Sequence, residues 1–529
     1  MTAGRVAADR RVESLDRVAL PGLLLLAAVL RLPDLATRGT WDGDQGHDML
    51  VLRTLVRDGV VPLLGPPTSI GDVHHGAWYY YLLSLAAVVT GGDSPLAVVA
   101  LIALAGIAAV GVVWWLARSV GGPVAGLVAG LAMAVSAAAI DESTFIWNPN
   151  LIALSSAVAL AAAWKAWAGG DRRWWLLAAV GTAVTMQCHV LGVALLPIVA
   201  VPFLLEARRR PLGPVWLGVL AIFFAAYLPL AINELTTGFS EVRAASDYLA
   251  AGRSGEEVAI PIRFGIVSLR VVSWPLTGLV TDGFLAGSLA TAAVIAIVVW
   301  RWWSPDPDER FVVRWFGLGL LWSVAFLTVA APSLAAVVRG LPNDHYHAFA
   351  DPMVFVLVGL GVAALVREAR APIGWATAAV ALAALLGWNL THLPPGVNRD
   401  GGFPAGDLAA HRADDALTTA GIDRVRAVPL RSLPDFKSTE AVAYPLVRLG
   451  RSVHAPMAKG LAPGSVASGA TADALVVLCD QLFRDAIGSD CGGPAEDAYA
   501  RTQGLDAAPL ERLEAAPGRW VSVYAAPEG

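Results

Sequence analysis

Long apolar stretches follow one another along most of the chain, from Val18 to Leu390. A helix needs roughly 20 apolar residues to cross a hydrocarbon core of about 30 Å, and most of these stretches reach or approach that length. The pattern predicts a mainly α-helical, polytopic membrane protein with about eleven spans. The predicted spans cover residues 18–33, 95–117, 122–140, 149–168, 174–188, 190–206, 213–233, 283–302, 312–333, 352–367 and 372–391.

Arginine clusters predict the direction in which the chain crosses the membrane. Cytoplasmic loops carry an excess of Arg and Lys, and the clusters here share one side if residues 1–17 are cytoplasmic. The clusters are Arg5 to Arg17, Arg118, Arg172-Arg173, Arg208-Arg209-Arg210, Arg301 to Arg314 and Arg367 to Arg370. An odd number of spans then places the C-terminus outside, in a multi-pass protein that we expect in the plasma membrane.

The first outer loop, about residues 34–94, is expected to carry two helices along the membrane surface. From His47 to Asp58, apolar and polar residues separate onto opposite faces of a helix. Ala77 to Thr90 is apolar, but as a span it would put one arginine group on the wrong side. Glu234 to Leu279, of mixed polarity, is a candidate for a further outer helix.

Residues 395–529 mix Pro, Gly, Asp and Arg with short apolar runs, which predicts a small extracytoplasmic α/β domain. Cys479 and Cys491 both lie in this domain, and they are candidates for a disulfide if the domain is extracytoplasmic. Predicted strands cover Val425–Pro429, Ala474–Leu478 and Trp520–Ala525, and predicted helices cover Asp407–Thr419 and Thr439–Leu449.

Composition supports the membrane class and narrows the partners. Hydrophobic residues make up 56% of the 529 positions and charged residues 15%, far from a soluble globular chain. A formal net charge of −5 gives no basic field for a nucleic acid. The sequence indicates no cofactor. A divalent metal is not excluded, but no spacing of ligand residues points to one.

Three carboxylates, Asp42, Asp44 and Asp48, stand close together directly after the first span. A transferase acting on an anomeric carbon needs one carboxylate to accept the proton of the attacking hydroxyl, close to where a lipid-borne donor surfaces. Asp44 is the candidate general base and Asp42 the second candidate, beside Trp41 and Gln45 as candidate substrate contacts. A solvated loop whose Asp residues cap the next helix explains the cluster equally well.

Two histidines, His74 and His75, precede an aromatic run at the proposed membrane surface. Their side chains are candidates to bind a donor phosphate. An interfacial aromatic belt with polar neighbours is the alternative interpretation. A metal site is a third, but no acidic or cysteine partner has a helpful spacing.

Two short outer loops between predicted spans carry further polar residues. In the first, the candidate substrate contacts are Asp141, Glu142, Trp147 and Asn148. The competing interpretation is an ordinary connection in which Asn148 caps the next helix and Pro149 occupies its first turn. In the second, Gln187 and His189 lie at a hairpin tip, where His189 is a candidate substrate contact and simple exposure is the alternative.

A late outer loop carries His345, Tyr346 and His347 just before the predicted span 352–367. Donor side chains next to a helix entry suit a phosphate or pyrophosphate head group. These three residues therefore join His74 and His75 as candidate donor-phosphate ligands.

Taken in order, the clusters resemble the integral-membrane GT-C glycosyltransferases, in the branch of protein O-mannosyltransferases and lipid A aminoarabinose transferases. The resemblance covers roughly residues 15 to 390. Trp41-Asp42-Gly43-Asp44-Gln45 resembles the acidic first-loop motif, with Asp44 at the essential Asp position and Gln45 in place of the usual Glu. Trp147-Asn148-Pro149-Asn150 resembles the second-loop signature of bacterial members, with Asn148 where some relatives have a second Asp.

The resemblance implies a GT-C-like catalytic domain over residues 18–394. It also implies an inverting transfer of a monosaccharide from a polyprenyl-phosphate donor to a lipid, glycan or protein acceptor at the outer face, with Asp44 as general base. The four outer histidines would help neutralise the departing phosphate, a task that requires positive charge or hydrogen-bond donors.

Two other classes of protein share parts of this pattern. A transporter or flippase of a glycan or lipid also has many spans, but the span interiors here contain almost no acidic or basic residues. A membrane-anchored glycan-binding protein does not explain polar outer loops that precede the C-terminal domain. The sequence therefore favours a transferase.

Overall fold

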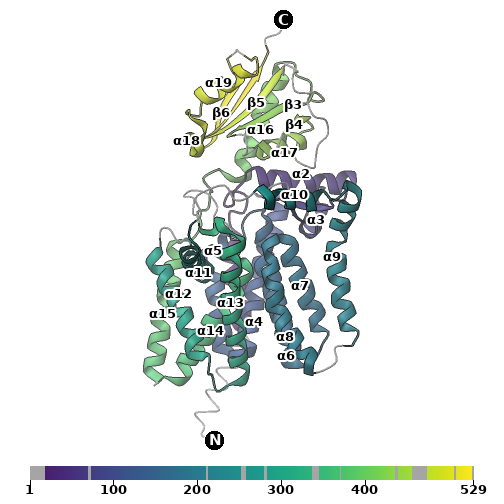
Figure 1. Ribbon diagram of the computed structural model, residues 1–529. Coiled ribbons are helices and arrows are strands. Elements are labelled where there is room, and N and C mark those ends of the chain that lie inside the picture. The colour runs from purple at the N-terminus through teal and green to yellow at the C-terminus, as the bar shows by residue number, and fades with distance from the viewer. Residues whose placement is uncertain are drawn as a thin grey trace.

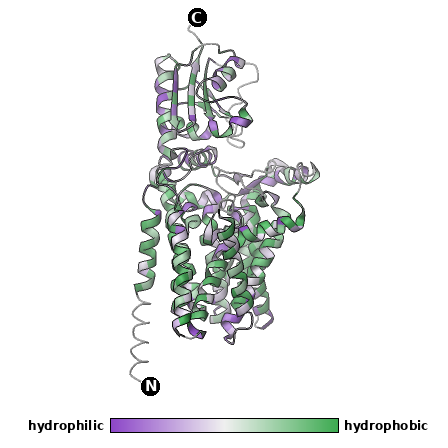
Figure 2. Cartoon of the chain, turned by 90° about the vertical axis from the view of Figure 1, so that its left-hand side faces the viewer, coloured by the Kyte–Doolittle hydropathy of each residue, from purple (hydrophilic) through white to green (hydrophobic). Residues whose placement is uncertain are grey.

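The chain has three layers: a bundle of apolar helices, a layer of shorter elements across one end, and an α/β domain above that layer (Figure 1). Hydrophobic residues dominate the bundle, whereas hydrophilic residues are spread through the α/β domain (Figure 2). The computed structural model describes residues 18–68, 73–209, 213–251, 258–278, 283–335, 345–369, 371–434, 439–455, 473–505 and 508–526. The predicted cytoplasmic segment 1–17, Arg210 and Arg370 lie outside these residues.

The bundle consists of long apolar helices. They are Val18–Arg31, α4 (Pro95–Val135), α6 (Ile152–Gly169), α7 (Trp174–Cys188), α8 (Leu195–Arg209), α9 (Val215–Thr237), α12 (Phe284–Arg301), α13 (Pro307–Ala330), α14 (Asp351–Glu368) and α15 (Ala371–Thr391). Each predicted span coincides with one of these helices or with half of α4. That helix is interrupted at Gly122, whose φ of 82° is accessible to glycine, followed by Pro123.

Eight helices among the described residues are long and apolar enough to cross a membrane, and shorter apolar helices accompany them. The chain is therefore a multi-pass membrane protein of the mainly α class. Apolar side chains point both toward the bundle interior and outward, as expected where lipid replaces water.

The layer across the end of the bundle is built from short elements. They are α2 (Gly43–Asp58), β1 (Leu64–Pro67), β2 (His74–Gly76), α3 (Trp78–Thr90), α5 (Ala137–Asp141), η1 (Asn148–Leu151), η2 (Val190–Ala194), α10 (Ser240–Ala251), α11 (Ile260–Thr277), η3 (Pro332–Ala335) and η4 (Ala348–Ala350). Strands β1 and β2 pair antiparallel. We refer to this as the outer layer, after the side of the membrane that the sequence predicts for these segments.

The helices predicted for the first outer loop are present. The amphipathic helix begins earlier than predicted, at Gly43, and buries Val51 and Leu52 while Arg57 and Asp58 are exposed. The apolar segment 77–90 forms α3, whose 13 residues are too few to cross a full hydrocarbon core. The segment 234–279 contains α10 and α11.

The C-terminal part is an α/β domain with a five-stranded sheet in the order β4-β3-β5-β7-β6. Strand β3 is parallel to β4 and β5, whereas β7 is antiparallel to β5 and β6. Every residue of the central strand β5 is buried. The elements are α16 (Gly402–Thr419), β3 (Val428–Leu433), α17 (Thr439–Arg448), β4 (Val453–His454), β5 (Ala474–Asp480), η5 (Gln481–Phe483), α18 (Arg484–Ile487), α19 (Pro494–Thr502), β6 (Glu511–Ala516) and β7 (Arg519–Ala525).

Two boundaries predicted for this domain are wrong by several residues. The first strand begins at Val428, because a turn closed by a hydrogen bond from Arg426 N to Asp423 O precedes it. Helix α16 begins at Gly402, five residues before the predicted start at Asp407. Cys479 and Cys491 are joined by a disulfide.

The α/β domain rests on the outer layer through α17, which lies against α2 (Figure 1). A Cβ atom on Gly46 would lie 2.0 Å from the carbonyl oxygen of Glu440, so the two helix backbones are in direct contact at this point. The Tyr444 hydroxyl donates to the carbonyl of Gly92 at 3.0 Å and adds a second contact. The absence of a side chain at Gly46 therefore sets how closely the domain approaches the layer below.

Replacing Gly46 by Ala is expected to push α17 away from α2, because the added methyl group meets backbone and not a flexible side chain. Overpacking of this kind costs about 1–3 kcal/mol. Thermal unfolding of the detergent-solubilised variant should occur at a lower temperature than that of the wild type, and limited proteolysis should cut the C-terminal domain faster. Gly387→Ala in α15, where nothing lies within 4 Å of the added atom, is the control. Equal stability of both variants would contradict the direct backbone contact.

Candidate active site

The acidic motif of the first outer loop forms the start of α2. Asp42 is the N-cap residue, and its backbone N–H donates to Gln45 Oε1 at 2.9 Å. The other end of the Gln45 amide donates to the carbonyl of Ile146 at 2.7 Å, which ties this loop to the 141–150 loop. Asp44 lies in the first turn and is exposed, whereas Asp42 is half-buried and Asp48 is buried. Asp44 is thus the most accessible of the three carboxylates, at a helix N-terminus where backbone dipoles stabilise negative charge.

Asp48 joins α2 to α3. The hydroxyls of Tyr79 and Tyr80 donate to its two oxygens at 2.6 and 2.8 Å. Burial raises the pKa of Asp48 to about 7, although these hydrogen bonds act in the opposite direction. Asp48, the third acidic residue of the motif, therefore lies in the interface between α2 and α3.

Side chains from four outer segments meet in a continuous row of rings. His75 and His189 lie 4.5 Å apart between ring centroids, and His189 stacks on Tyr346 at 4.2 Å. Trp147 contacts Tyr346 at 6.1 Å and His345 at 4.8 Å. Clusters that are far apart in the sequence therefore converge in one place. The alternative interpretation of His189 as an exposed hairpin tip is wrong, because this residue is buried.

A buried acidic cluster adjoins this row of rings. The indole N–H of Trp274 donates to Glu142 Oε1 at 2.6 Å, and His345 Nδ1 lies 3.7 Å from the same oxygen. His345 Nε2 is 2.9 Å from Asn150 Oδ1. Burial raises the pKa of Glu142 above its ordinary value. A carboxyl group of this kind can hold a proton near neutral pH.

His347 occupies the far side of the cluster. Its Nδ1 lies 3.8 Å from Asp351 Oδ1, and its ring is 5.5 Å from that of Trp274. Within the described residues, neither ring nitrogen of His347 has a hydrogen-bond partner, although the residue is fully buried. Buried polar atoms usually have partners, so this position retains hydrogen-bonding capacity for a substrate group.

Burial keeps four of the buried histidines uncharged near neutral pH. Burial lowers the pKa of His47 to about 4 and that of His75 to about 3, and it holds those of His189 and His347 well below their ordinary range. A neutral imidazole donates one hydrogen bond but carries no charge. Of the two roles expected for the outer histidines, hydrogen bonding fits these residues and charge neutralisation requires another group.

That charge is available on α11, in residues that sequence analysis missed. Arg263 and Arg270 are both buried and lie on one face of this helix. The Arg270 guanidinium donates to the carbonyl of Leu334 at 3.0 Å and lies 5.5 Å from the Trp274 ring. It is also close enough to His347 to lower the pKa of that imidazole. The available signal was a pair of arginines seven positions apart in a largely apolar segment.

The other predicted residues lie at the margins. His74 contacts Glu241 of α10 through its backbone N–H at 2.7 Å and its ring Nδ1 at 3.0 Å. Asn148 donates to the carbonyl of Cys188 at 2.6 Å, so the prediction that its side chain caps the next helix is wrong. Asp141 is exposed at the end of α5.

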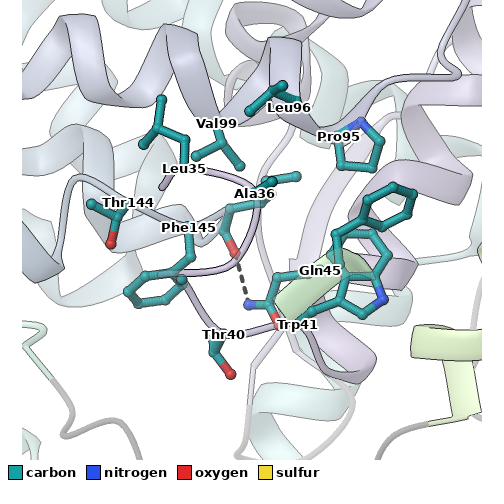
Figure 3. A pocket seen from close by; sticks show the side chains of 13 residues that line it. Leu35, Ala36, Thr40, Trp41, Gln45, Pro95, Leu96, Val99, Thr144 and Phe145 are labelled. Carbon is teal, nitrogen blue, oxygen red and sulfur yellow. Dashed lines mark hydrogen bonds between the residues drawn. The ribbon is translucent and has the colours of Figure 1, made fainter. Parts of the chain in front are cut away.

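A small apolar pocket lies beside the acidic motif, and Figure 3 shows the Gln45 amide on one side of it, hydrogen-bonded to the 141–150 loop. Its walls come from the first outer loop, the start of α4, the 141–150 loop and α16. The lining residues are Leu35, Ala36, Gly39, Thr40, Trp41, Gln45, Pro95, Leu96, Val99, Thr144, Phe145, Ile146 and Phe403. Such walls suit a hydrocarbon group better than a sugar. Among the described residues, no group of three or more metal-ligating side chains could hold an ion.

Comparison with known proteins identifies this architecture. The family model for dolichyl-phosphate-mannose-protein mannosyltransferases matches residues 74–232, which include His74, His75, Trp147 and His189. No curated protein matches the chain at a significant level.

Two solved structures share the fold over most of the chain. ArnT from Cupriavidus metallidurans, bound to undecaprenyl phosphate, is 12% identical with a TM-score of 0.60, covering 96% of this chain and 97% of that chain. The archaeal oligosaccharyltransferase AglB from Archaeoglobus fulgidus, in complex with an inhibitory peptide and a dolichol-phosphate, is 15% identical with a TM-score of 0.53. That match covers 89% of this chain and 70% of AglB. At these identities the likeness establishes the fold, and the fold is the one expected from the sequence.

Replacing Asp48 by Asn tests the α2–α3 junction through its pH dependence. The folded state raises the pKa of Asp48 from 3.8 to about 7, so its contribution to stability is greatest at low pH and is lost as the pH rises through about 7. The Tm of the wild type should therefore fall relative to that of Asp48→Asn between about pH 5 and pH 8. Asp58→Asn, an exposed position on the same helix, should show no such trend. A constant Tm difference would show that Asp48 is ionised throughout.

Proposed function

We propose that this chain is a membrane glycosyltransferase of the GT-C type, and that it transfers a monosaccharide from a polyprenyl-phosphate donor to a hydroxyl group. The acceptor is a lipid, a glycan or a protein, and the reaction takes place at the outer face of the plasma membrane. Transfer inverts the anomeric configuration, and Asp44 is the general base.

One observation carries this proposal: Asp44 is the exposed carboxylate of the acidic motif, in a loop tied directly to the segments that carry the rings. A base has to be accessible to the acceptor and close to the groups that hold the donor. Asp42 is less suitable, because one of its oxygens lies 3.3 Å from Arg519 Nη2. Asp48 is unsuitable, because it is buried and each of its oxygens accepts a hydrogen bond from a tyrosine hydroxyl.

The chemistry follows from these positions. As the acceptor oxygen attacks the anomeric carbon, its proton passes to the Asp44 carboxylate. The new C–O bond forms on the face opposite the bond to the phosphate oxygen, which breaks, and polyprenyl phosphate leaves with one more negative charge. A single displacement inverts the configuration.

The leaving phosphate gains charge, so donors and cations aimed at it stabilise the transition state. Arg270 supplies a permanent charge, and neutral His75 and His347, together with His345, supply hydrogen bonds. Undecaprenyl phosphate in the ArnT structure and dolichol-phosphate in the AglB structure support a donor of the same class for this chain. We assign Glu142 and Trp147 to the sugar, since a carboxyl group suits its hydroxyls and an aromatic face suits its ring.

The orientation proposed for the chain has two supports. A disulfide in the C-terminal domain is typical of an oxidising, extracytoplasmic compartment. The helix ends farthest from that domain carry arginines, among them Arg301 and Arg367, which both donate to the buried carboxylate of Glu309. An excess of arginine at this end is expected of cytoplasmic loops.

Replacing Asp44 by Asn should lower the rate at which labelled sugar is transferred from polyprenyl-phosphate donors in vesicles by roughly 10²-fold or more, because the base is lost. Asp58→Asn removes the same charge from an exposed position of the same helix and should transfer at the wild-type rate. Unchanged transfer by Asp44→Asn with loss in Asp42→Asn would move the base to Asp42. Movement of the donor across the bilayer, without consumption of donor by the wild type, would establish a flippase instead.

A further inference from the structure

The C-terminal domain holds every hydrogen-bonding group of Trp41, the residue that leads into the acidic motif. The backbone N–H of Trp41 donates to Asp400 Oδ2 at 2.9 Å, and its carbonyl accepts from Arg519 Nη1 at 2.9 Å. Its indole N–H donates to the carbonyl of Ala441 at 2.8 Å. The ring packs edge-on against Phe403 at 4.9 Å. The loop before α2 is therefore fixed by residues that lie about 360 to 480 positions later in the chain.

These partners are themselves held in place. Arg519 also contacts Asp42 Oδ1 at 3.3 Å and Asp480 Oδ2 at 3.4 Å. Arg399 donates to both oxygens of Asp480 at 3.2 Å. Asp400 accepts a further hydrogen bond from the hydroxyl of Thr40 at 2.5 Å. We refer to the contacts that hold Trp41 as the clamp. Because each charged group in it is paired, the clamp is a connected network and not a set of isolated contacts.

Glu440, at the start of α17, brings one more carboxyl group to the acidic motif. It is buried, and its Oε2 accepts a hydrogen bond from Thr439 at 2.7 Å. Its Oε1 has no hydrogen-bond partner among the described residues. Asp42 and Asp44 are close enough to interact with it electrostatically. A buried carboxyl group with one oxygen lacking a hydrogen bond, close to two other acids, is unfavourable for stability, which points to a functional role.

We propose that the C-terminal domain positions the catalytic loop: Asp400, Arg519 and the Ala441 carbonyl fix Trp41, and the Glu440 carboxyl sets the electrostatic environment of Asp44. This inference rests on the proposed function, because it takes Asp44 as the base. Glu440 is a positioning residue that acts through Asp44. The domain is thus part of the active site, whatever acceptor it also contacts.

The charged groups around Asp44 decide whether ionisation of Glu440 makes Asp44 a stronger or a weaker base. Glu440 of α17 and Asp48 of α2 are close enough to interact with Asp44 electrostatically. Asp42 precedes it in the chain, and Arg519 compensates the charge of Asp42. Burial raises the pKa of Glu440 to about 7. When Glu440 ionises, it adds a negative charge beside Asp44 and makes Asp44 a stronger base. The same ionisation lowers the stability of the folded protein relative to that at lower pH, because it places a charge in a buried site beside two other acids.

The test compares Glu440→Gln with the wild type in two measurements across neutral pH. In vesicle transfer assays, kcat/KM of the wild type should rise several-fold as the pH passes through about 7, and the rise should be absent from Glu440→Gln. In thermal unfolding, Glu440→Gln should be the more stable protein above this pH. Glu440→Asp, which keeps the charge, should retain part of the rise in kcat/KM.

A residue with only a structural role gives the opposite pattern. Glu440→Gln would then be less stable than the wild type, transfer would fall by the same factor at every pH, and the inference would be overturned. Loss of the rise in Glu440→Gln, with transfer abolished in Asp44→Asn, supports both proposals. Transfer that depends on Asp44 but shows the same pH profile in Glu440→Gln overturns this inference and leaves the proposed function standing. If the wild type transfers no sugar, the proposed function fails, and the coupling of Glu440 to Asp44 fails with it.

Discussion

The anchoring of Trp41 by the C-terminal domain is the contact on which the geometry of the outer face depends. Trp41 leads directly to Asp42, which begins α2, so the clamp sets where that helix starts and where Asp44 points. Gln45 carries this constraint to the 141–150 loop, where Trp147 and Asn150 meet His345. Fixing one backbone position therefore orders loops that arise from widely separated parts of the sequence.

Burial gives the polar groups of the outer layer different tasks. Histidines lose their charge there, because a buried imidazolium is costly, and retain one donor and one acceptor each. Carboxyl groups such as Glu142 and Glu440 keep their protons to higher pH for the same reason. Arg270 stays charged and is paired with a carbonyl and an aromatic face. Asp44 is exposed at the start of a helix, and we propose it as the group that exchanges protons with an acceptor.

The sequence predicted the membrane helices well, because apolar stretches of the right length are a local signal that lipid imposes directly. It also placed His75, His189, Trp147 and His345 on one side of the membrane, and the structure brings them into contact. The order of spans was enough for that result, since every second loop lies on the same side. The roles of these residues remain predictions.

The residues around the acidic motif could not be predicted, since they depend on how a separate domain packs. Glu440 lies in an ordinary amphipathic helix, and nothing local marks it as a neighbour of Asp44. Arg519 and Asp400 become recognisable only after the sheet and α16 are in place. Asp48 looked equivalent to Asp44 in the sequence, but α3 packs against Asp48, whereas Asp44 is exposed.

The most direct test of the account is a cryo-EM structure of the protein in lipid nanodiscs supplied with a polyprenyl phosphate. The account predicts phosphate density at the outer layer, between the first turn of α2 and Arg270 of α11, within hydrogen-bonding reach of His345 or His347. Phosphate density at the opposite end of the bundle, or along a path through its interior, would contradict a transferase site on this face.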